Sequence, residues 1–357
     1  MKRTIPFLAI AVVGLAMLGS CGNKEQGVRI AVLMRNTHEQ LLADYADNVR
    51  RLAEERGVAV NIQDALSAPD TQLTQLQTLI GQGFRYFVIV PVASELSDQM
   101  NRMIADVGGA AAYSNTSPTT SSLRIGPNFF YASSPEVVGG RYQAQLVADF
   151  FDANPGRAPN GTVNMILIVG ELGHPAQIFR EAGLMEGLAQ RGYAVNMVAR
   201  GTANWAPDQA NELMNAWIAS FGGQFNVVVA QNDGMALGAV QSMIQNGMVK
   251  DDTSDGTRLT VPVFGIDATA DAIASMRRYE LHGTVLQDAV GQSTVAFDLM
   301  HQVATGTFAP GNSAGGIPAA TEAIAEAPAN DQSIIGQSYL VPFVPVDRQS
   351  EFFRNHP

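Results

Sequence analysis

Short apolar runs alternate with amphipathic segments along most of the chain. The segment 28–34 is apolar except at Arg29, as expected of a buried strand, and 41–55 carries its apolar residues at helical spacing. The same alternation predicts strands at 58–62, 86–91, 110–113 and 128–132, helices at 71–80, 96–107 and 135–151, and a Ser/Thr-rich loop at 115–122. Because strands separated by helices pair in parallel, this half of the chain predicts a parallel sheet with helices on both faces.

The pattern begins again after a connector rich in Gly, Pro and Asn at 154–161. It predicts strands at 163–169, 193–199, 225–230, 261–266 and 283–286, and helices at 178–190, 209–221, 233–246, 270–278 and 291–305. The Ala-, Gly- and Pro-rich segment 308–330 is expected to be a surface loop, and 334–346 regains strand character. Two similar halves predict an α/β fold with two doubly wound parallel-sheet lobes, and the cleft between such lobes is the default ligand site.

The N-terminus has the features of a processing signal. Lys2 and Arg3 precede a short apolar stretch, and Leu-Gly-Ser-Cys at 18–21 resembles a bacterial lipobox. We therefore predict a signal peptide at 1–20, lipidation of Cys21, and a polar tether at 21–27 that holds the protein on a lipid bilayer. The alternative is an ordinary cleaved signal followed by an incidental thiol.

Composition removes several classes of function. The net charge of −11 and the pI near 4.9 argue against nucleic-acid binding, which favours basic stripes. Cys21 is the only cysteine, so the chain can form neither an internal disulfide nor a thiolate metal cluster. Beyond the N-terminal stretch, no apolar run is long enough to cross a bilayer.

Polar residues follow several of the predicted strands, and open parallel sheets bind ligands at those strand ends. The tip 170–175 contains His174, which can donate to a hydroxyl, and Arg180 in the next helix can hold a sugar ring oxygen with its planar fork. The alternative for this pair is a helix cap with a surface salt bridge. Trp205 lies in a polar loop and can stack on the C–H face of a sugar, or else it covers the core. Trp217, inside a predicted helix, is expected to be core.

Three further strand ends carry candidate residues. Asn232 offers donors and an acceptor without charge, which suits a polyol better than a phosphate, and Asp233 beside it is placed to cap the following helix. Asp267 ends a buried strand, where its carboxylate can accept from two vicinal hydroxyls; the alternative is a cap for helix 270–278. Gln287 and Asp288 follow the next strand and are expected at a crossover between the lobes.

Together these motifs resemble the periplasmic glucose/galactose-binding proteins of the ribose-binding superfamily. The resemblance is close from residue 170 to about 305 and returns at 341–343. It rests on Gly-Glu-x-Gly-His-Pro at 170–175, the Trp205 loop, Asn-Asp-x-Met-Ala-x-Gly-Ala at 232–239, Pro-Val-Phe-Gly-Ile-Asp at 262–267 and Gly-Thr-Val-Leu at 283–286. No single one of these motifs is specific, but their combination in this order is.

The resemblance implies a Venus-flytrap periplasmic binding protein, with two lobes, a three-segment hinge and one sugar bound between the lobes. It implies an N-terminal lobe of 28–132 plus 287–339 and a C-terminal lobe of 133–286 plus 340–357. It also implies a monomer without cofactor that passes its monosaccharide to the membrane subunits of an ABC importer, and some members signal to a chemoreceptor. The residues that match family sugar contacts are His174, Arg180, Trp205, Asn232 and Asp267, with Asn115 matching another from the first lobe.

The chain also departs from the family pattern. Ala176 stands where the family has an aspartate, and Gln287 replaces an asparagine. Family tyrosine, aspartate and phenylalanine contacts fall on Arg35, Glu39 and Leu41, so the sugar or its pose is expected to differ. The family's calcium loop corresponds to 154–164, but there is no acidic residue between Pro155 and Asn164. Because Ca²⁺ requires several carboxylates, we predict no metal site there.

Three hypotheses follow. The leading one is a lipid-anchored receptor for a monosaccharide, glucose or galactose, that has no enzymatic activity. The second keeps the fold but changes the ligand to a pentose, a nucleoside or a signalling molecule, as the altered first lobe suggests. The third is a glycosidase, which would need two carboxylates at a matched separation; Asp233 and Asp267 are available, but Asp233 is better explained as a helix cap.

Overall fold

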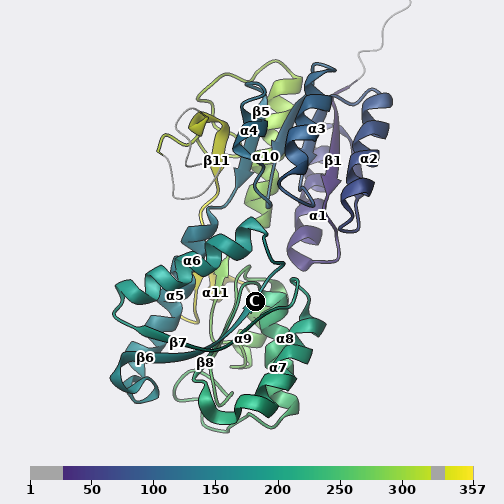
Figure 1. The fold of residues 1–357 in the computed structure, drawn as a ribbon. Helices are drawn as coiled ribbons and strands as arrows, with labels where there is room; N and C mark the ends of the chain where they lie inside the picture. Colours follow the sequence, from purple (N-terminus) through teal and green to yellow (C-terminus); the bar gives the residue numbers. More distant parts are fainter. Residues whose placement is uncertain (1–26, 323–333, 357) are drawn as a thin grey trace, which may run out of the picture.

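The computed structural model describes residues 27–322 and 334–356 and has two α/β lobes, one above the other in Figure 1. The predicted signal peptide, Cys21 and most of the predicted tether lie outside the described residues. Within the described part of the chain, no helix is both long enough and apolar enough to span a membrane. No group of three or more His, Cys, Asp or Glu side chains is placed to hold a metal ion in these residues.

The N-terminal lobe is built on a six-stranded parallel sheet of order β11-β5-β4-β3-β1-β2. Its strands are β1 (Arg29–Met34), β2 (Ala59–Asp64), β3 (Tyr86–Ile89), β4 (Ala110–Tyr113), β5 (Phe129–Ser133) and β11 (Ser338–Leu340). Its helices are α1 (Gln40–Arg56), α2 (Pro69–Gly81), α3 (Leu96–Ala105), α4 (Thr120–Leu123) and α10 (Ala289–Ala304). Buried side chains of α1 and α10 form one core cluster with the sheet, and those of α2, α3 and α4 form another with its opposite face.

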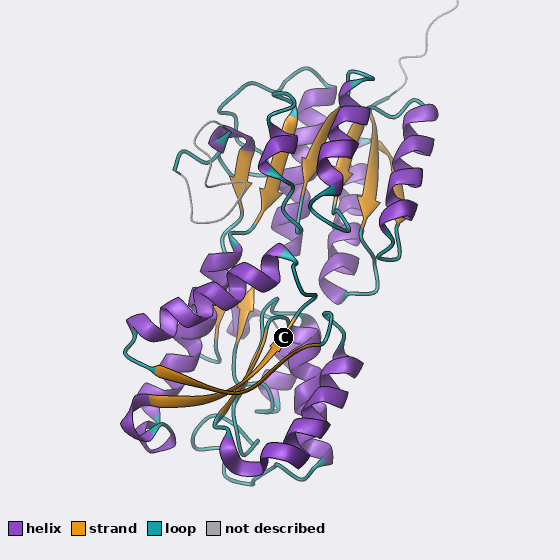
Figure 2. Cartoon of the chain, viewed as in Figure 1, coloured by secondary structure: helices purple, strands orange, loops and turns teal. Residues whose placement is uncertain are grey.

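The C-terminal lobe contains a four-stranded parallel sheet of order β7-β6-β8-β9 and an antiparallel pair, β10 with β12. The strands are β6 (Thr162–Val169), β7 (Ala194–Thr202), β8 (Val227–Ala230), β9 (Val263–Phe264), β10 (Thr284–Leu286) and β12 (Val344–Val346). The helices are α5 (Glu136–Ala153), α6 (Pro175–Gln190), α7 (Pro207–Phe221), α8 (Asp233–Gln245), α9 (Ala270–Arg277) and α11 (Glu351–Asn355). Helices α5 and α6 contribute to one core cluster, and α7, α8 and α9 to the other, so helices cover both faces of this sheet as well (Figure 2).

The chain passes between the two lobes three times, from β5 to α5, from β10 to α10 and from β11 to β12. The predicted fold class is therefore confirmed. The segment 334–346, expected to regain strand character, contains two strands: β11 and β12 belong to different sheets, and the chain crosses between them at 341–343. Apolar composition alone could not reveal this crossing, since a buried hinge segment is as apolar as a strand.

Smaller differences concern the connectors. The predicted loop at 115–122 contains the start of α4, and the connector at 154–161 forms two short 3-10 helices, Pro155–Arg157 and Pro159–Gly161. Trp217 is half-buried and packs against the core of the C-terminal lobe rather than inside it. In the described part of 308–330, an isolated bridge joins Ala314 to Ile317.

The packing of α5 against α6 fixes the floor of the cleft between the lobes. A Cβ atom built on Gly140 would lie 2.1 Å from the backbone oxygen of Arg180, and one built on Gly183 would lie 2.1 Å from that of Val137. Glycine at both positions therefore lets the two helix backbones touch. This close approach places the side chain of Arg180 beside Glu136, the first residue of α5, at the entrance to the second lobe.

Candidate functional site

A narrow cavity of about 20 Å³ lies between the lobes, at the carboxyl ends of the parallel strands. All nine predicted ligand-binding residues line it, and all but Glu39 are buried. They are Arg35, Glu39, Asn115, His174, Arg180, Trp205, Asn232, Asp267 and Gln287. Leu41 and Ala176, the two positions where the family carries a phenylalanine and an aspartate, complete the lining. The structure thus brings together residues that lie up to 252 positions apart along the chain, from Arg35 to Gln287 (287 − 35 = 252).

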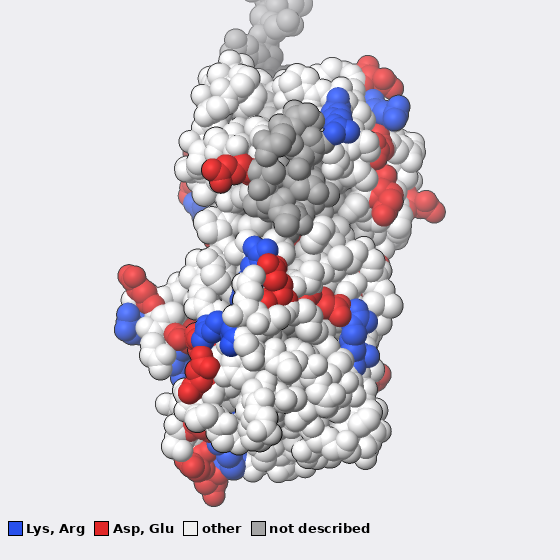
Figure 3. All heavy atoms as spheres, turned by 60° about the vertical axis from the view of Figure 1, so that its left-hand side comes forward, with Lys and Arg blue, Asp and Glu red and all other residues white. Residues whose placement is uncertain are grey.

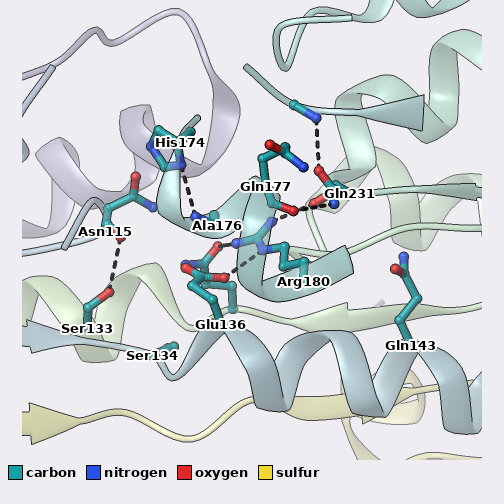
Figure 4. Close-up of polar contacts among 12 residues, drawn as sticks. Asn115, Ser133, Ser134, Glu136, Gln143, His174, Ala176, Gln177, Arg180 and Gln231 are labelled. Atoms are coloured by element: carbon teal, nitrogen blue, oxygen red, sulfur yellow. Dashed lines mark hydrogen bonds and ion pairs between the residues drawn. The ribbon is translucent and has the colours of Figure 1, made fainter. Parts of the chain in front are cut away.

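His174 is held as a neutral ring by its neighbours. It caps α6, and its Nδ1 accepts from the backbone N–H of Ala176 at 3.1 Å, so a neutral imidazole carries its proton on Nε2. Nε2 lies 3.1 Å from the Oγ1 of Thr116 and 3.1 Å from Nη1 of Arg35 (His174 and Ala176 are shown in Figure 4). Burial, and then the charges of Arg35 and Arg180, hold the pKa of His174 well below its usual range. The ring can therefore donate to Thr116, while Arg35 faces a second donor.

Arg180 is fixed by a buried ion pair. Its Nε donates to a carboxylate oxygen of Glu136 at 2.6 Å, and both side chains are almost completely buried. Its Nη1 donates to the backbone oxygen of Gln231 and its Nη2 to Gln287 Oε1, at 2.5 and 2.8 Å. Figure 4 shows the guanidinium between Glu136 and Gln231. The alternative of a surface salt bridge was therefore wrong, because the carboxylate partner comes from the start of α5 and lies in the interior.

Trp205 forms one wall of the cavity. Its indole lies on the backbone of Gly170, where a Cβ atom would be 2.1 Å from the ring, so only glycine allows this approach. The His174 ring packs edge-on at 5.3 Å between centroids, and the indole Nε1 is buried without a hydrogen-bond partner among the described residues. Trp205 lines the cavity and also belongs to the core cluster of the C-terminal lobe, so part of its indole can contact a ligand.

The prediction that Asp233 caps α8 was wrong. Asn232 is the cap: its Oδ1 accepts from the backbone N–H of Met235 at 2.9 Å, and its Nδ2 donates to the backbone oxygen of Trp205. Asp233 is the first helical residue and points into the lobe, where it accepts from the backbone N–H of Thr269 and the hydroxyl of Thr284. Either side chain could have capped the helix on sequence alone, since Asn and Asp are equally good at this position. Burial raises the pKa of Asp233 to about 7.

Two carboxylates line the cavity, and Asp267 is the one that Arg35 does not hold. Thr269, not Asp267, caps α9, so the helix-cap alternative for Asp267 was wrong. Its side chain is 6% exposed and makes no hydrogen bond or ion pair with any described residue. Burial raises the pKa of Asp267 well above its usual range, opposed by Arg180 and reinforced by Asp233, Glu39 and Glu136.

Three cavity residues have backbone conformations that side chains other than glycine seldom adopt. Asn115, Trp205 and Asp267 have φ angles of 60°, 66° and 128°. Conformations of this kind cost about 1–3 kcal/mol each and concentrate at functional sites, although Asn tolerates the left-handed region well. Their presence at three separate strand ends of one cavity indicates that side-chain position, rather than stability, determines the backbone there.

The N-terminal lobe contributes a compact polar group. Both oxygens of Glu39 accept from Nη2 of Arg35, at 2.7 and 2.9 Å, and one also accepts from Nδ2 of Asn36 at 2.8 Å. Asn115 lies on the same side of the cleft, and its backbone oxygen accepts from Ser133 at 3.5 Å (Figure 4). Arg35 is thereby oriented across the cleft toward His174.

Sequence reasoning missed four polar residues that orient the site. Glu136 and Gln231 hold Arg180, Thr116 meets His174, and Asn36 holds Glu39. Gln231 adjoins the recognised Asn232 motif and Thr116 follows Asn115, so position next to a motif could have found both. Glu136 gave no local signal, because its partner lies 44 positions away.

Comparison with known proteins gives the chain its family. Residues 30–308 match the family model described as "Periplasmic binding protein domain". The chain belongs to the periplasmic binding protein family. A Rhizobium meliloti protein assigned to rhizopine binding is 32% identical over 279 residues, which cover 78% of this chain and 81% of the relative. The D-galactose/methyl-galactoside binding periplasmic protein of Haemophilus influenzae is 26% identical over 256 residues, covering 71% and 74%.

A solved structure has the same architecture. The ABC transporter solute-binding protein of Bacillus halodurans, crystallised with myo-inositol, superposes with a TM-score of 0.72 at 24% identity, covering 91% of this chain and 96% of that one. That structure shares the fold of this chain, and the two relatives named above are described as binding proteins rather than as enzymes. On the face in Figure 3, the few Lys and Arg side chains lie mostly beside acidic ones and form no basic stripe.

Proposed function

We propose that this protein is the substrate-binding component of an ABC-type importer for a small cyclic polyol, bound in the cavity between the lobes. The observation that carries the proposal is the unpartnered Asp267 beside Trp205: a buried carboxylate that can accept from vicinal hydroxyls, next to an indole face on which a ring can lie. The nine predicted residues are its ligand contacts, and none of them acts as a catalyst.

Two ligand classes compete within this proposal. Glucose or galactose is favoured by the C-terminal half of the site, where His174, Arg180, Trp205, Asn232 and Asp267 follow the pattern of the glucose/galactose-binding proteins. A cyclitol is favoured by the N-terminal half, where Arg35 and Leu41 stand in place of the two aromatic side chains that contact the sugar in the glucose/galactose-binding proteins. The Rhizobium meliloti relative and the Bacillus halodurans structure point in the same direction, toward rhizopine and myo-inositol.

Lobe movement would admit and enclose the ligand. Arg35 and His174 approach across the narrow cavity, so the lobes must part, or Arg35 must turn, before a ring can enter. We propose that 28–132 plus 287–339 and 133–286 plus 340–357 move as two bodies about the crossings. Once a ligand is inside, one of its oxygens can lie between Arg35 and His174 and accept from both. The importer would then recognise the closed form of a monomer, and a chemoreceptor would be a second partner that recognises the same form.

The remaining part of the proposal concerns attachment. Lipidation of Cys21 would hold the protein at a membrane surface, with 22–27 as the tether. Mass spectrometry of the native protein tests this directly: an acylated Cys21 at the mature N-terminus is the expected result, and an unmodified cysteine would contradict it.

Isothermal titration calorimetry on residues 24–357 tests the ligand class, with glucose, galactose, ribose, xylose and myo-inositol as probes. Tight binding of glucose or galactose would assign the C-terminal lobe as the source of specificity. Binding of myo-inositol without measurable binding of either hexose would assign specificity to Arg35, Glu39 and Leu41. Binding of purine nucleosides with no binding of any polyol would refute the proposal.

A further inference from the structure

The cavity contains one acid that the protein leaves without a partner. Asp267 is buried, and no described residue gives its carboxylate a hydrogen bond or an ion pair. It lines the central cavity and two wider spaces that adjoin it, one of which Arg277 also lines. A buried carboxylate in this state is costly unless a ligand supplies the missing donor or charge.

The charges nearest Asp267 do not neutralise it. Arg180 attracts its ionised form, but Asp233, Glu39 and Glu136 all oppose it. Arg180 is paired with Glu136, and Arg35 is held by both oxygens of Glu39. Each arginine of the cavity thus has its own carboxylate, and Asp267 remains as an additional acid without a cationic partner.

A wider space beside the cavity is also lined by acidic side chains. We call it the cleft mouth: the space lined by Glu39, Trp205, Asp208, Asp267 and Asp271, among other residues. Asp208 and Asp271 are exposed and form no ion pair among the described residues. Among the described residues that line this space there is no Lys or Arg. Each also lies in the first turn of a helix, where a carboxylate interacts favourably with the helix dipole.

Trp205 lies between the two spaces, and its indole face, like the acids, attracts a positive charge. It lines both of them. The face of an indole attracts cations, and Arg180 already lies 5.8 Å from its centroid. A positively charged ligand group at this place would therefore meet a carboxylate, an aromatic face and two further acids near the entrance.

We propose that the natural ligand is an amino-substituted polyol, a sugar or cyclitol in which an ammonium group replaces one hydroxyl. Its hydroxyls face the donors Arg35, His174 and Arg180, and its ammonium faces Asp267 toward the cleft mouth. This inference rests on the proposed function, since it names the substrate class of the same site. An acidic sugar fits poorly, because its carboxylate would meet Asp267 and the acids of the cleft mouth.

Calorimetry with matched neutral and amino ligands tests the inference. The probes are D-glucose with its 2-, 3- and 6-amino-deoxy derivatives, and myo-inositol with its positional amino-deoxy isomers, so that the position of the amine is scanned. We expect at least one amine to bind ten-fold or more tightly than its parent polyol at pH 7 and low salt. That advantage is expected to shrink as salt is added, because exposed charges are screened.

Variants separate a local charge effect from a general one. Asp271→Asn should lower the ratio of amine to parent affinity a few-fold. The matched control is Asp70→Asn, another exposed first-turn acid, which lies at the start of α2 and does not line the cavity or the cleft mouth, and it should leave the ratio unchanged. An equal ratio in wild type and Asp271→Asn would contradict a role for the acids at the cleft mouth.

The outcomes distinguish the two proposals. If the parent polyols bind and no amine exceeds them, the inference fails and the proposed function stands. If D-glucuronate binds more tightly than glucose, the inference is also overturned. If neither parents nor amines bind, the proposed polyol function itself is refuted.

Discussion

The two sides of the cleft are built differently. On the C-terminal side, Asn232 is held by a helix terminus, and Arg180 by Glu136 and the backbone of Gln231, all within one lobe. Arg180 also donates to Gln287, and His174 meets Thr116, across the boundary between the lobes. On the N-terminal side, Arg35 and Glu39 hold each other, and Arg35 reaches across the cleft. The C-terminal side is therefore prepared before the ligand arrives, while the N-terminal side completes its contacts when the lobes meet.

This difference separates affinity from specificity. Preorganised donors and acceptors lose little freedom on binding, so we expect most of the binding free energy to come from the C-terminal side. The N-terminal side differs most from the glucose/galactose pattern, at Arg35, Glu39 and Leu41. We expect it to decide which ring fits.

Removing Arg180 is expected to have the largest effect. Arg180→Ala leaves Glu136 buried without its cation, and breaking a buried pair in this way costs about 3–5 kcal/mol. Urea denaturation should show this loss in the free energy of unfolding. The double variant Arg180→Met with Glu136→Gln removes both charges and should recover much of it. If Arg180→Ala alone kept the wild-type midpoint, the ion pair would not stabilise the preorganised side.

Asp267→Ala and Trp205→Ala should each weaken ligand binding by about 100-fold or more. Two charge-assisted hydrogen bonds contribute roughly 3 kcal/mol, and each 1.4 kcal/mol is a factor of ten. Calorimetry measures the loss, and circular dichroism at the same temperature checks that the fold is intact. Trp217→Phe, the other tryptophan, is the control and should bind normally. Wild-type affinity in either cavity variant would overturn the site assignment.

Asp233→Asn should change how stability depends on pH. The pKa of Asp233 is raised from 3.8 to about 7, so the native state keeps a proton that the unfolded state has lost between these values. Its contribution therefore falls as pH rises from about 4 to 7, by no more than about 1.4 kcal/mol per pH unit. Burial lowers the pKa of His282 to about 4, which acts in the opposite direction. The informative measurement is the difference between wild type and variant across this range; parallel curves would rule out the raised pKa.

Leu41→Phe should sharpen hexose binding slightly. It restores an aromatic side chain at a position that lines the cavity, and a stacking contact contributes about 0.5–1.5 kcal/mol. We expect glucose affinity to rise by about ten-fold or less, with myo-inositol affinity unchanged or lower. Leu42→Phe, at a buried position in the core of the lobe, serves as the comparison for packing effects. A parallel gain for every polyol would show that position 41 does not control specificity.

Calcium should have no effect. With no acid between Pro155 and Asn164, neither EDTA nor added Ca²⁺ is expected to move the unfolding temperature. Differential scanning fluorimetry checks this, and a large reversible shift would refute it.

The fold was predictable from the sequence because each lobe repeats one strong pattern, an apolar strand followed by an amphipathic helix. The cavity was predictable where motifs follow strand ends, as at His174 and Asp267. Glu136 was not, since its role depends on α5 touching α6 through Gly140 and Gly183. Nor was the choice between Asn232 and Asp233 as the cap, because both side chains suit the position and only the placement of Thr269 and Thr284 separates them.

The three crossings also bear on how the chain is made. The sheet of the N-terminal lobe is covered by α10 and ends in β11, so neither lobe is a continuous stretch of polypeptide. Residues 29–133 emerge from the ribosome long before 289–304 and 338–340 are available to complete their core. Contacts over such separations form slowly. We expect that a nascent chain of this design cannot complete the core of its N-terminal lobe until β11 has been synthesised.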